Sequence, residues 1–134
     1  MKIKLIDFNG RAPVRAHDND AGADVFSPRG QTIYPGQVYK LPLGFGLELP
    51  DGLVGFVFPR SSLSARGIVC ELPPIDSGYR GEIHAVVTNV GNDGYDIKEG
   101  ERIGQLVILP VVTPEFTYEK SAERGTGAFG STGR

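Results

Sequence analysis

The chain has 134 residues, of which 40% are hydrophobic and 22% are charged, and its formal net charge is −2. This length fits one domain with a modest core, and the charge offers no basic surface that would indicate nucleic-acid binding. No apolar run is long enough to span a membrane, and the N-terminus lacks the pattern of a signal peptide. Cys70 is the only cysteine and cannot form an internal disulfide, so the composition suits a reducing cytoplasm.

Glycine and proline are spread among short β-like runs, a pattern typical of many strands joined by tight turns. The first strand is expected over residues 2–6, and an acidic turn begins at Asp18. The turn resembles the start of a calcium loop, but its sixth position is Ala23 instead of Gly and its twelfth is Arg29 instead of Glu. We therefore interpret it as an ordinary polar turn. Asp24, which stands among small residues just before an apolar pair, is a candidate functional acid.

The middle of the chain is predicted to contain further strands and one helical turn. Residues 33–41 are expected to form a hairpin around Pro35 and Gly36. A helical turn is predicted over residues 60–67, with serines near its start and glycine at its end. The other expected elements are strands at 45–49, 53–58 and 103–109, a turn at 97–101, and one more short strand through 116–118.

Residues 72–82 are predicted to be the return of a second hairpin, because apolar residues alternate on both sides of them. Pro73 and Pro74 stiffen the approach, since each ring fixes φ and removes a backbone donor. Asp76 then follows the apolar Ile75. A carboxylate held on a rigid turn near apolar groups is suited to taking a proton from water. Taken alone, the segment is explained more simply by an aspartate that caps a turn.

Residues 119–134 differ from the β domain that we predict over residues 1–118. They contain four glycines and a single large apolar side chain, Phe129. Such a segment cannot bury enough surface to fold on itself, so we predict a mobile glycine-rich tail. A terminus without function is the simplest interpretation, but Arg124 and Phe129 place a cation and an aromatic face on a backbone that can approach a ligand closely.

The polar candidates together form a set that suits a polyphosphate. Cations and hydroxyls can hold phosphate oxygens, one acid can help to hold Mg²⁺ through water, and another can activate water. The set contains no strong nucleophile, so direct attack by water is the simplest chemistry. Its members are Asp24, Arg60, Ser61, Ser62, Asp76, Tyr79, Gln105, Arg124, Ser131 and Thr132.

Five ordered motifs resemble those of the trimeric dUTP pyrophosphatases (dUTPases), and they run through nearly the whole chain. They are residues 21–25 (AGADV), 59–63 (PRSSL), 75–82 (IDSGYRGE), 100–105 (GERIGQ) and the tail from 124 to 133. The resemblance implies an all-β jelly-roll homotrimer that splits dUTP into dUMP and pyrophosphate with Mg²⁺. It also implies shared sites. One chain would supply the first, second and fourth motifs, a second chain the hairpin, and the third chain the tail.

The resemblance also assigns roles to the hairpin and the aromatic residue of the tail. Asp76 would orient the attacking water toward the α-phosphate and meet the sugar 3′-hydroxyl, and Tyr79 would pack under the deoxyribose. Backbone groups near Pro74 and Ile75 would read uracil, and Phe129 would stack on it. The family usually has Gly shortly before the Ile-Asp pair, where this chain has two prolines, and the hairpin is shorter than is usual. Both departures fall on the base-reading element.

The remaining roles concern the triphosphate. Asp24 would hold Mg²⁺ through water, and Arg124 would reach the terminal phosphate, with Ser131 and Thr132 also binding substrate. Phosphates or their bound waters would be held by Arg60, Ser61, Ser62 and Gln105.

Two other functions are compatible with these residues. A related dCTP deaminase, or an enzyme that carries out both steps, would share the fold but would need an additional acid near the pyrimidine C4, for which Glu71 is the candidate. Glu71 is explained more simply as a solvated strand residue. The other possibility is a nucleotide-sensing trimer whose main task is to bind a protein partner.

Overall fold

The computed structural model describes residues 1–119, and it contains ten β-strands and one short helix within them. This content confirms the prediction of an all-β chain with one short helix. In chain order the elements are β1 (Lys4–Asp7), β2 (Ala23–Phe26), β3 (Gln31–Ile33), β4 (Val38–Pro42), β5 (Phe45–Glu48), β6 (Leu53–Pro59), α1 (Ser61–Ser64), β7 (Ile68–Glu71), β8 (His84–Asn89), β9 (Tyr95–Ile97) and β10 (Arg102–Pro110).

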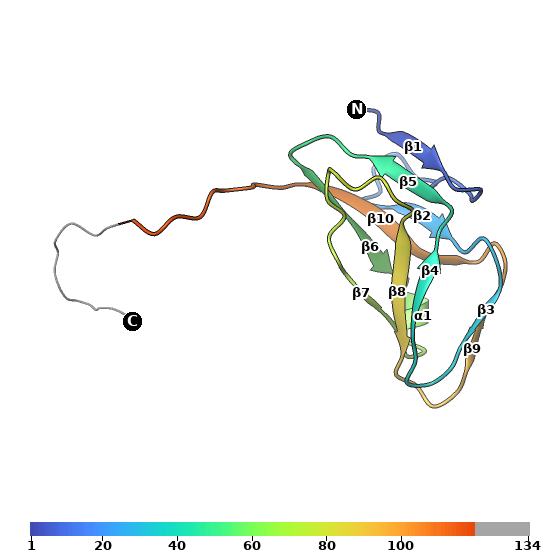
Figure 1. Ribbon diagram of the computed structural model, residues 1–134. Helices are drawn as coiled ribbons and strands as arrows, with labels where there is room; N and C mark the ends of the chain where they lie inside the picture. Colours follow the sequence, from blue (N-terminus) through green and yellow to red (C-terminus); the bar gives the residue numbers. More distant parts are fainter. Residues whose placement is uncertain (120–134) are drawn as a thin grey trace, which may run out of the picture.

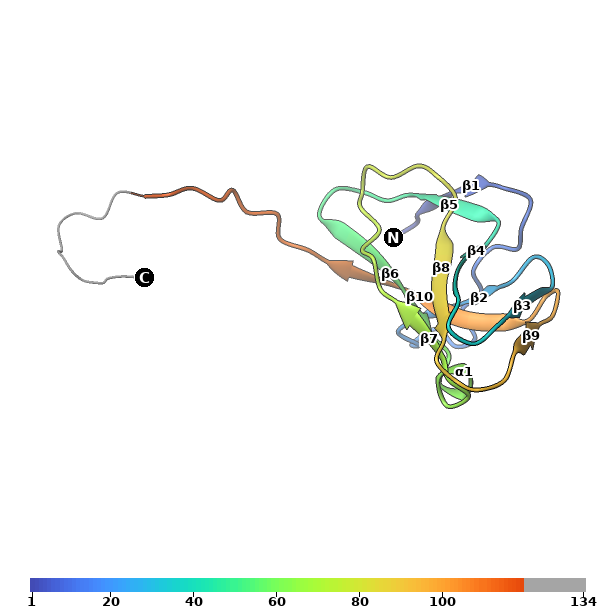
Figure 2. The same cartoon turned by 60° about the horizontal axis from the view of Figure 1, so that its bottom comes forward.

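The strands form four small antiparallel sheets. In one three-stranded sheet β10 lies between β2 and β6, and in the other β8 lies between β4 and β7. The remaining pairs are β1 with β5 and β3 with β9. The two larger sheets lie against each other, while β1 and β5 occupy one edge of the body and β3 and β9 another (Figures 1 and 2).

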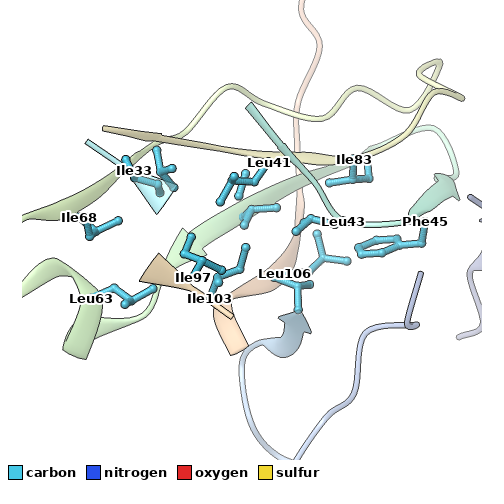
Figure 3. Close-up of a cluster of buried hydrophobic side chains, with 14 of the residues drawn as sticks. Ile33, Leu41, Leu43, Phe45, Leu63, Ile68, Ile83, Ile97, Ile103 and Leu106 are labelled. Carbon is cyan, nitrogen blue, oxygen red and sulfur yellow. The ribbon is translucent and has the colours of Figure 1, made fainter. Parts of the chain in front are cut away.

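The hydrophobic core lies between the two larger sheets (Figure 3). Leu41 and Ile68 enter it from one sheet, and Ile103 and Leu106 enter it from the other, and all four are buried. Every second residue of β8 is buried, as expected for a strand with one face on the core. This alternation is the pattern from which the strand was predicted.

Asn89 is a fully buried polar residue at the end of β8. Its side-chain amide donates hydrogen bonds to the carbonyls of Ile33 and Asp93, at 2.9 and 2.8 Å, and its oxygen accepts one from the N–H of Gly91 at 2.9 Å. A buried amide with these partners avoids the cost of an unpaired polar group. It also ties β8 to the end of β3, which closes this side of the core.

Most of the predicted elements are confirmed. Residues 68–71 and 84–89 pair as an antiparallel hairpin, and strands overlap the ranges predicted at residues 2–6, 45–49, 53–58 and 103–109, with ends that differ by at most two residues. The turn predicted over residues 97–101 is closed by a hydrogen bond from the Glu101 N–H to the Lys98 carbonyl.

The helical turn predicted over residues 60–67 is confirmed as α1. Arg60 is its N-cap residue with an extended backbone (φ −81°, ψ 131°), and no side chain caps the helix. Leu63 fixes the turn to the core, because it is buried. No helix in the described part of the chain is long and apolar enough to cross a membrane.

The hairpin predicted over residues 33–41 is wrong. The turn is present, with the Gln37 N–H donating to the Tyr34 carbonyl at 3.1 Å, but the flanking strands separate after it. β3 pairs with β9, and β4 pairs with β8 in a different sheet. A local turn signal gives the reversal of the chain but not the partners of the two strands, which depend on contacts far apart in the sequence.

The strand predicted through residues 116–118 is also wrong. Residues 111–119 contain no strand, and Phe116 and Tyr118 are almost completely exposed. The segment leaves the body after β10 (Figure 1). Apolar side chains alone cannot form a strand, because a strand needs a neighbour for its backbone hydrogen bonds.

Candidate active site

The hairpin of β7 and β8 opens into a pocket because its two arms separate. The strands pair as far as Glu71 and Val86. Beyond that point Pro73 and Pro74 have no N–H with which to continue the ladder. The arm instead joins β6, where Ile75 exchanges two backbone hydrogen bonds with Gly55, at 2.8 and 3.1 Å. The gap between the arms is therefore a consequence of the proline pair and of a second partner strand.

This hairpin pocket has a volume of about 200 Å³ and contains the described residues that were predicted to contact sugar and base. Val57 and Ile83 give it an apolar wall from the core side, and polar or ionisable side chains from β4, β7, β8 and the connecting loop surround the rest. Its lining is Lys40, Val57, Glu71, Pro73, Pro74, Ile75, Asp76, Tyr79, Glu82, Ile83, His84 and Val86.

Tyr79 is held in a fixed position within the hairpin pocket. Its hydroxyl donates to the Glu82 carbonyl at 2.9 Å, and its N–H donates to the Asp76 carbonyl at 3.1 Å. A Cβ at residue 81 would come within 2.5 Å of the Tyr79 hydroxyl oxygen, so the ring can lie here only because that residue is Gly81. The ring is thus a rigid wall close to the Asp76 backbone.

Fewer backbone groups are available for base reading than the sequence suggested. Both backbone groups of Ile75 are bonded to Gly55, and Pro74 has no N–H. Of this pair, the Pro74 carbonyl, an acceptor, is the backbone group without a backbone hydrogen bond among the described residues.

A second, polar pocket of about 350 Å³ gathers residues of three motifs. Its position follows from strand order, because β10 pairs with β2 on one side and with β6 on the other. Gln105 lies directly opposite Asp24 on β2 and opposite Phe58 on β6, and Arg60 follows the end of β6. The lining is Ala16, His17, Asp20, Gly22, Asp24, Arg60, Ser61, Arg102, Gly104 and Gln105.

Close packing positions Gln105 beside the first motif. A Cβ at Gly22 would lie 2.3 Å from the Gln105 side-chain oxygen, so a larger residue would displace the amide. Ser62 was predicted to belong to this group, but it lies on α1 outside the lining of both pockets, where it is exposed.

Asp24 is paired with a cation that sequence analysis did not assign. The Arg102 guanidinium lies 3.3 Å from the Asp24 carboxylate, and the Arg60 guanidinium donates to the Arg102 carbonyl at 3.4 Å. His17 and Asp20, which are joined at 3.1 Å, also line the polar pocket. Arg102 belongs to the fourth motif, so that motif could have indicated it as a candidate site residue. His17 and Asp20 precede the first motif, so no motif indicated them.

The polar pocket fits a hydrated Mg²⁺ ion better than a metal held by protein alone. No group of three potential ligands among His, Cys, Asp and Glu is present in the described residues. Mg²⁺ keeps several waters and commonly takes one or two carboxylates together with substrate phosphates. The carboxylates of Asp24 and Asp20 in a pocket with two arginines match that pattern.

The thiol of Cys70 on β7 is not suited to act as a nucleophile. Burial raises its pKa to about 11. Because the thiolate is the reactive form, the group is protonated and unreactive near neutral pH. This agrees with the expectation that water, and not a side chain, attacks the substrate.

The two pockets share no lining residue, and Asp76 lies only in the hairpin pocket. Within one chain the predicted water-orienting acid is therefore separated from the predicted phosphate and metal residues. Arg124, Phe129, Ser131 and Thr132 lie outside the described residues.

Comparison with known proteins gives a consistent result over the whole chain. The family model described as dUTPase matches residues 9–133. A deoxyuridine 5′-triphosphate nucleotidohydrolase of Clostridium tetani is 39% identical to this chain in an alignment of 140 residues. The alignment covers 100% of this chain and 97% of that protein.

Two solved structures are also similar. A mutant of the dUTPase from phage phi11 of S. aureus, which coordinates a structural Mg(II) ion, has a TM-score of 0.85 and 26% identity over 91% of this chain and 99% of that one. A mutant of the dUTPase from Staphylococcus bacteriophage 80alpha, solved with dUpNHpp, has a TM-score of 0.82 and 30% identity over 98% of both chains. The predicted jelly-roll fold is thereby confirmed.

Proposed function

Because the chain belongs to the dUTPase family and hydrolyses dUTP, we propose that it does so at a composite site, where the polar pocket of one subunit faces the hairpin pocket of another. The observation that carries this proposal is the separation of the two pockets, which share no residue. The enzyme is a dUTP diphosphatase, and its products are dUMP and pyrophosphate. The proposed assembly is a homotrimer in the cytoplasm, which suits a chain with one cysteine.

The polar pocket is proposed to bind the triphosphate. Arg60, Ser61 and Gln105 would hold phosphate oxygens or their bound waters, and the neighbouring Ser62 on α1 is proposed to assist them. Asp24 would hold the ion through water. Bound Mg²⁺ would offset the charge that develops on the phosphate oxygens. When substrate and ion enter, the Arg102 guanidinium that now faces Asp24 is a ready cation for phosphate.

The hairpin pocket is proposed to bind the nucleoside and to supply the general base. Asp76 would accept a proton from a water molecule, whose oxygen bonds to the α-phosphorus while the bond from that phosphorus to the bridging oxygen breaks. Pyrophosphate then leaves from the polar pocket. Asp76 would also contact the sugar 3′-hydroxyl. A narrow pocket with rigid backbone walls leaves no space for a methyl group on the base, and Pro74 and Ile75 lie in that wall.

Residues 119–134 are proposed to be a tail that closes over the site from the third chain. Arg124 would bind the terminal phosphate through charge-assisted hydrogen bonds, and Phe129 would stack on uracil. Ser131 and Thr132 would add hydroxyl contacts to the substrate.

The function is tested by measuring pyrophosphate release from dUTP, dTTP, dCTP and UTP under identical conditions. We expect a clear preference for dUTP, because a methyl group on the base and a 2′-hydroxyl on the sugar both meet the pocket wall. Similar kcat/KM values for all four nucleotides would contradict the proposed use of the hairpin pocket.

Deamination of dCTP is a second candidate function, and one observation favours it. Glu71 lines the hairpin pocket and is therefore close to a bound base. Water would replace the 4-amino group and release ammonia. An ammonia assay with dCTP separates this activity from dUTP hydrolysis, and Glu71→Gln should abolish any ammonia release that is found.

Tyr79→Ala is expected to reduce the discrimination between dUTP and UTP. The ring is fixed by its hydrogen bond to Glu82, so its removal opens the space next to the ribose 2′-carbon. The measurement is the ratio of kcat/KM for the two nucleotides. Tyr79→Phe keeps the wall but lacks the hydroxyl and serves as the control, and an unchanged ratio in Tyr79→Ala would place sugar selection elsewhere.

A further inference from the structure

The turn between β5 and β6, residues 50–53, contacts the hairpin next to Asp76. The Ser77 hydroxyl donates to the Asp51 carboxylate at 3.1 Å. The turn itself is well defined, since the Leu53 N–H donates to the Pro50 carbonyl at 3.3 Å and Gly52 has φ +87°. A carboxylate on an ordered turn therefore reaches the hairpin from outside.

The two neighbours of Asp76 are both tied to the same part of the molecule. Ile75 is bonded through its backbone to Gly55 on β6, and Ser77 is bonded through its side chain to Asp51 just before β6. Asp76 stands between these attachment points and is itself exposed. β6 and its preceding turn therefore determine where the Asp76 carboxylate lies.

On the other side of Asp76, the loop is attached to the rest of the fold farther along, where the Gly44 N–H donates to the Glu82 carboxylate at 2.9 Å. Arg80 donates to the Ser77 carbonyl at 2.5 Å, and the Tyr79 N–H donates to the Asp76 carbonyl at 3.1 Å. Both bonds lie within the loop, so they fix its shape but not its position relative to the two larger sheets. The bond between Ser77 and Asp51 links the loop tip to another element through side chains.

We propose that Asp51 is a positioning residue for dUTP hydrolysis, which holds Asp76 in place through Ser77. The inference rests on the proposed role of Asp76 as the group that orients the attacking water. Asp51 lines neither pocket, so the proposal assigns it no contact with the nucleotide. Its loss should change kcat and leave substrate affinity close to normal.

The test is a double-mutant cycle on kcat. Asp51→Ala and Ser77→Ala should each lower kcat about tenfold, which is less than the roughly 100-fold that a 1 Å misplacement can cost. Because both changes break the same bond, the double variant should be no slower than either single variant. Asp51→Asn should retain near-normal kcat, because its amide oxygen can accept the same hydroxyl hydrogen. Affinity for a non-hydrolysable dUTP analogue and the melting temperature should change little in all of them.

Asp93→Ala is the matched control, since Asp93 is exposed and lines neither pocket. Multiplicative effects of the two single changes, or a normal kcat in Asp51→Ala, would overturn the inference. A loss confined to KM would overturn it as well. The role of Asp76 is judged separately with Asp76→Asn: if that variant is inactive while Asp51→Ala is fully active, the positioning role fails and the proposed function stands.

Discussion

Asp76→Asn is expected to lower kcat by about 10²–10⁴-fold, which is the usual contribution of a positioned general base. Asparagine has nearly the same size and can still contact the sugar hydroxyl, but it cannot take a proton from water at neutral pH. The backbone of this segment is held by Ile75 and Ser77, so the fold should be unaffected. Steady-state kinetics with dUTP, together with binding of a non-hydrolysable analogue, measure the two effects separately.

The control for this prediction is Asp93→Ala, which leaves Asp76 and its neighbours unchanged. Near-normal turnover of Asp76→Asn would remove the carboxylate from the mechanism. Loss of analogue binding together with loss of turnover would instead indicate that Asp76 serves mainly to bind the sugar.

Two inactive variants are expected to restore activity when they assemble together. Consider a mixed trimer of Asp24→Asn and Asp76→Asn chains. A site in it is complete when its polar pocket comes from an Asp76→Asn chain, which keeps Asp24, and its hairpin pocket comes from an Asp24→Asn chain, which keeps Asp76. Random assembly of equal amounts would make about one site in four complete, because each of the two conditions is met about half of the time. Co-expressed and purified mixed trimers should therefore recover about a quarter of the normal kcat per site.

A mixture of Asp76→Asn with Asp76→Ala provides the control, because every hairpin in it is defective. This mixture should show no recovery. Equal activity in the two mixtures would mean that no site is divided between chains, and the proposed composite site would be wrong.

Much of the local structure could be predicted from the sequence. The alternation in residues 84–89 predicted a strand, because every second residue faces the core. The apolar runs on both sides of residues 72–82 predicted the hairpin. The helical turn at α1 was also found. In each case the signal is short-range, since periodicity and turn residues act over a few positions.

Strand partners required information that short patterns do not contain. β9 has only three residues, and its pairing with β3 joins positions 62 to 66 residues apart, such as Ile33 with Tyr95 and Gln31 with Ile97, so no local signal selected it over a hairpin with β4. The strand expected near Phe116 failed for a related reason, because the described chain offers it no neighbour.

The candidate site was predicted unevenly. Its residue types suggested a polyphosphate, but the meeting of Asp24, Arg60 and Gln105 depends on β10 lying between β2 and β6. Arg102 was missed as the partner of Asp24 because a charged residue on a strand carries no periodic signal that identifies its contacts. Asp51 was missed because an aspartate before glycine is an ordinary turn residue.

The separation of the two pockets has a consequence for how activity depends on the amount of protein. If a complete site requires several chains, a dissociated chain has no complete site, so dilution lowers the activity per chain. A nucleotide that binds only the assembled form favours assembly by mass action. At low protein concentration, substrate would therefore increase the number of working sites as well as occupy them.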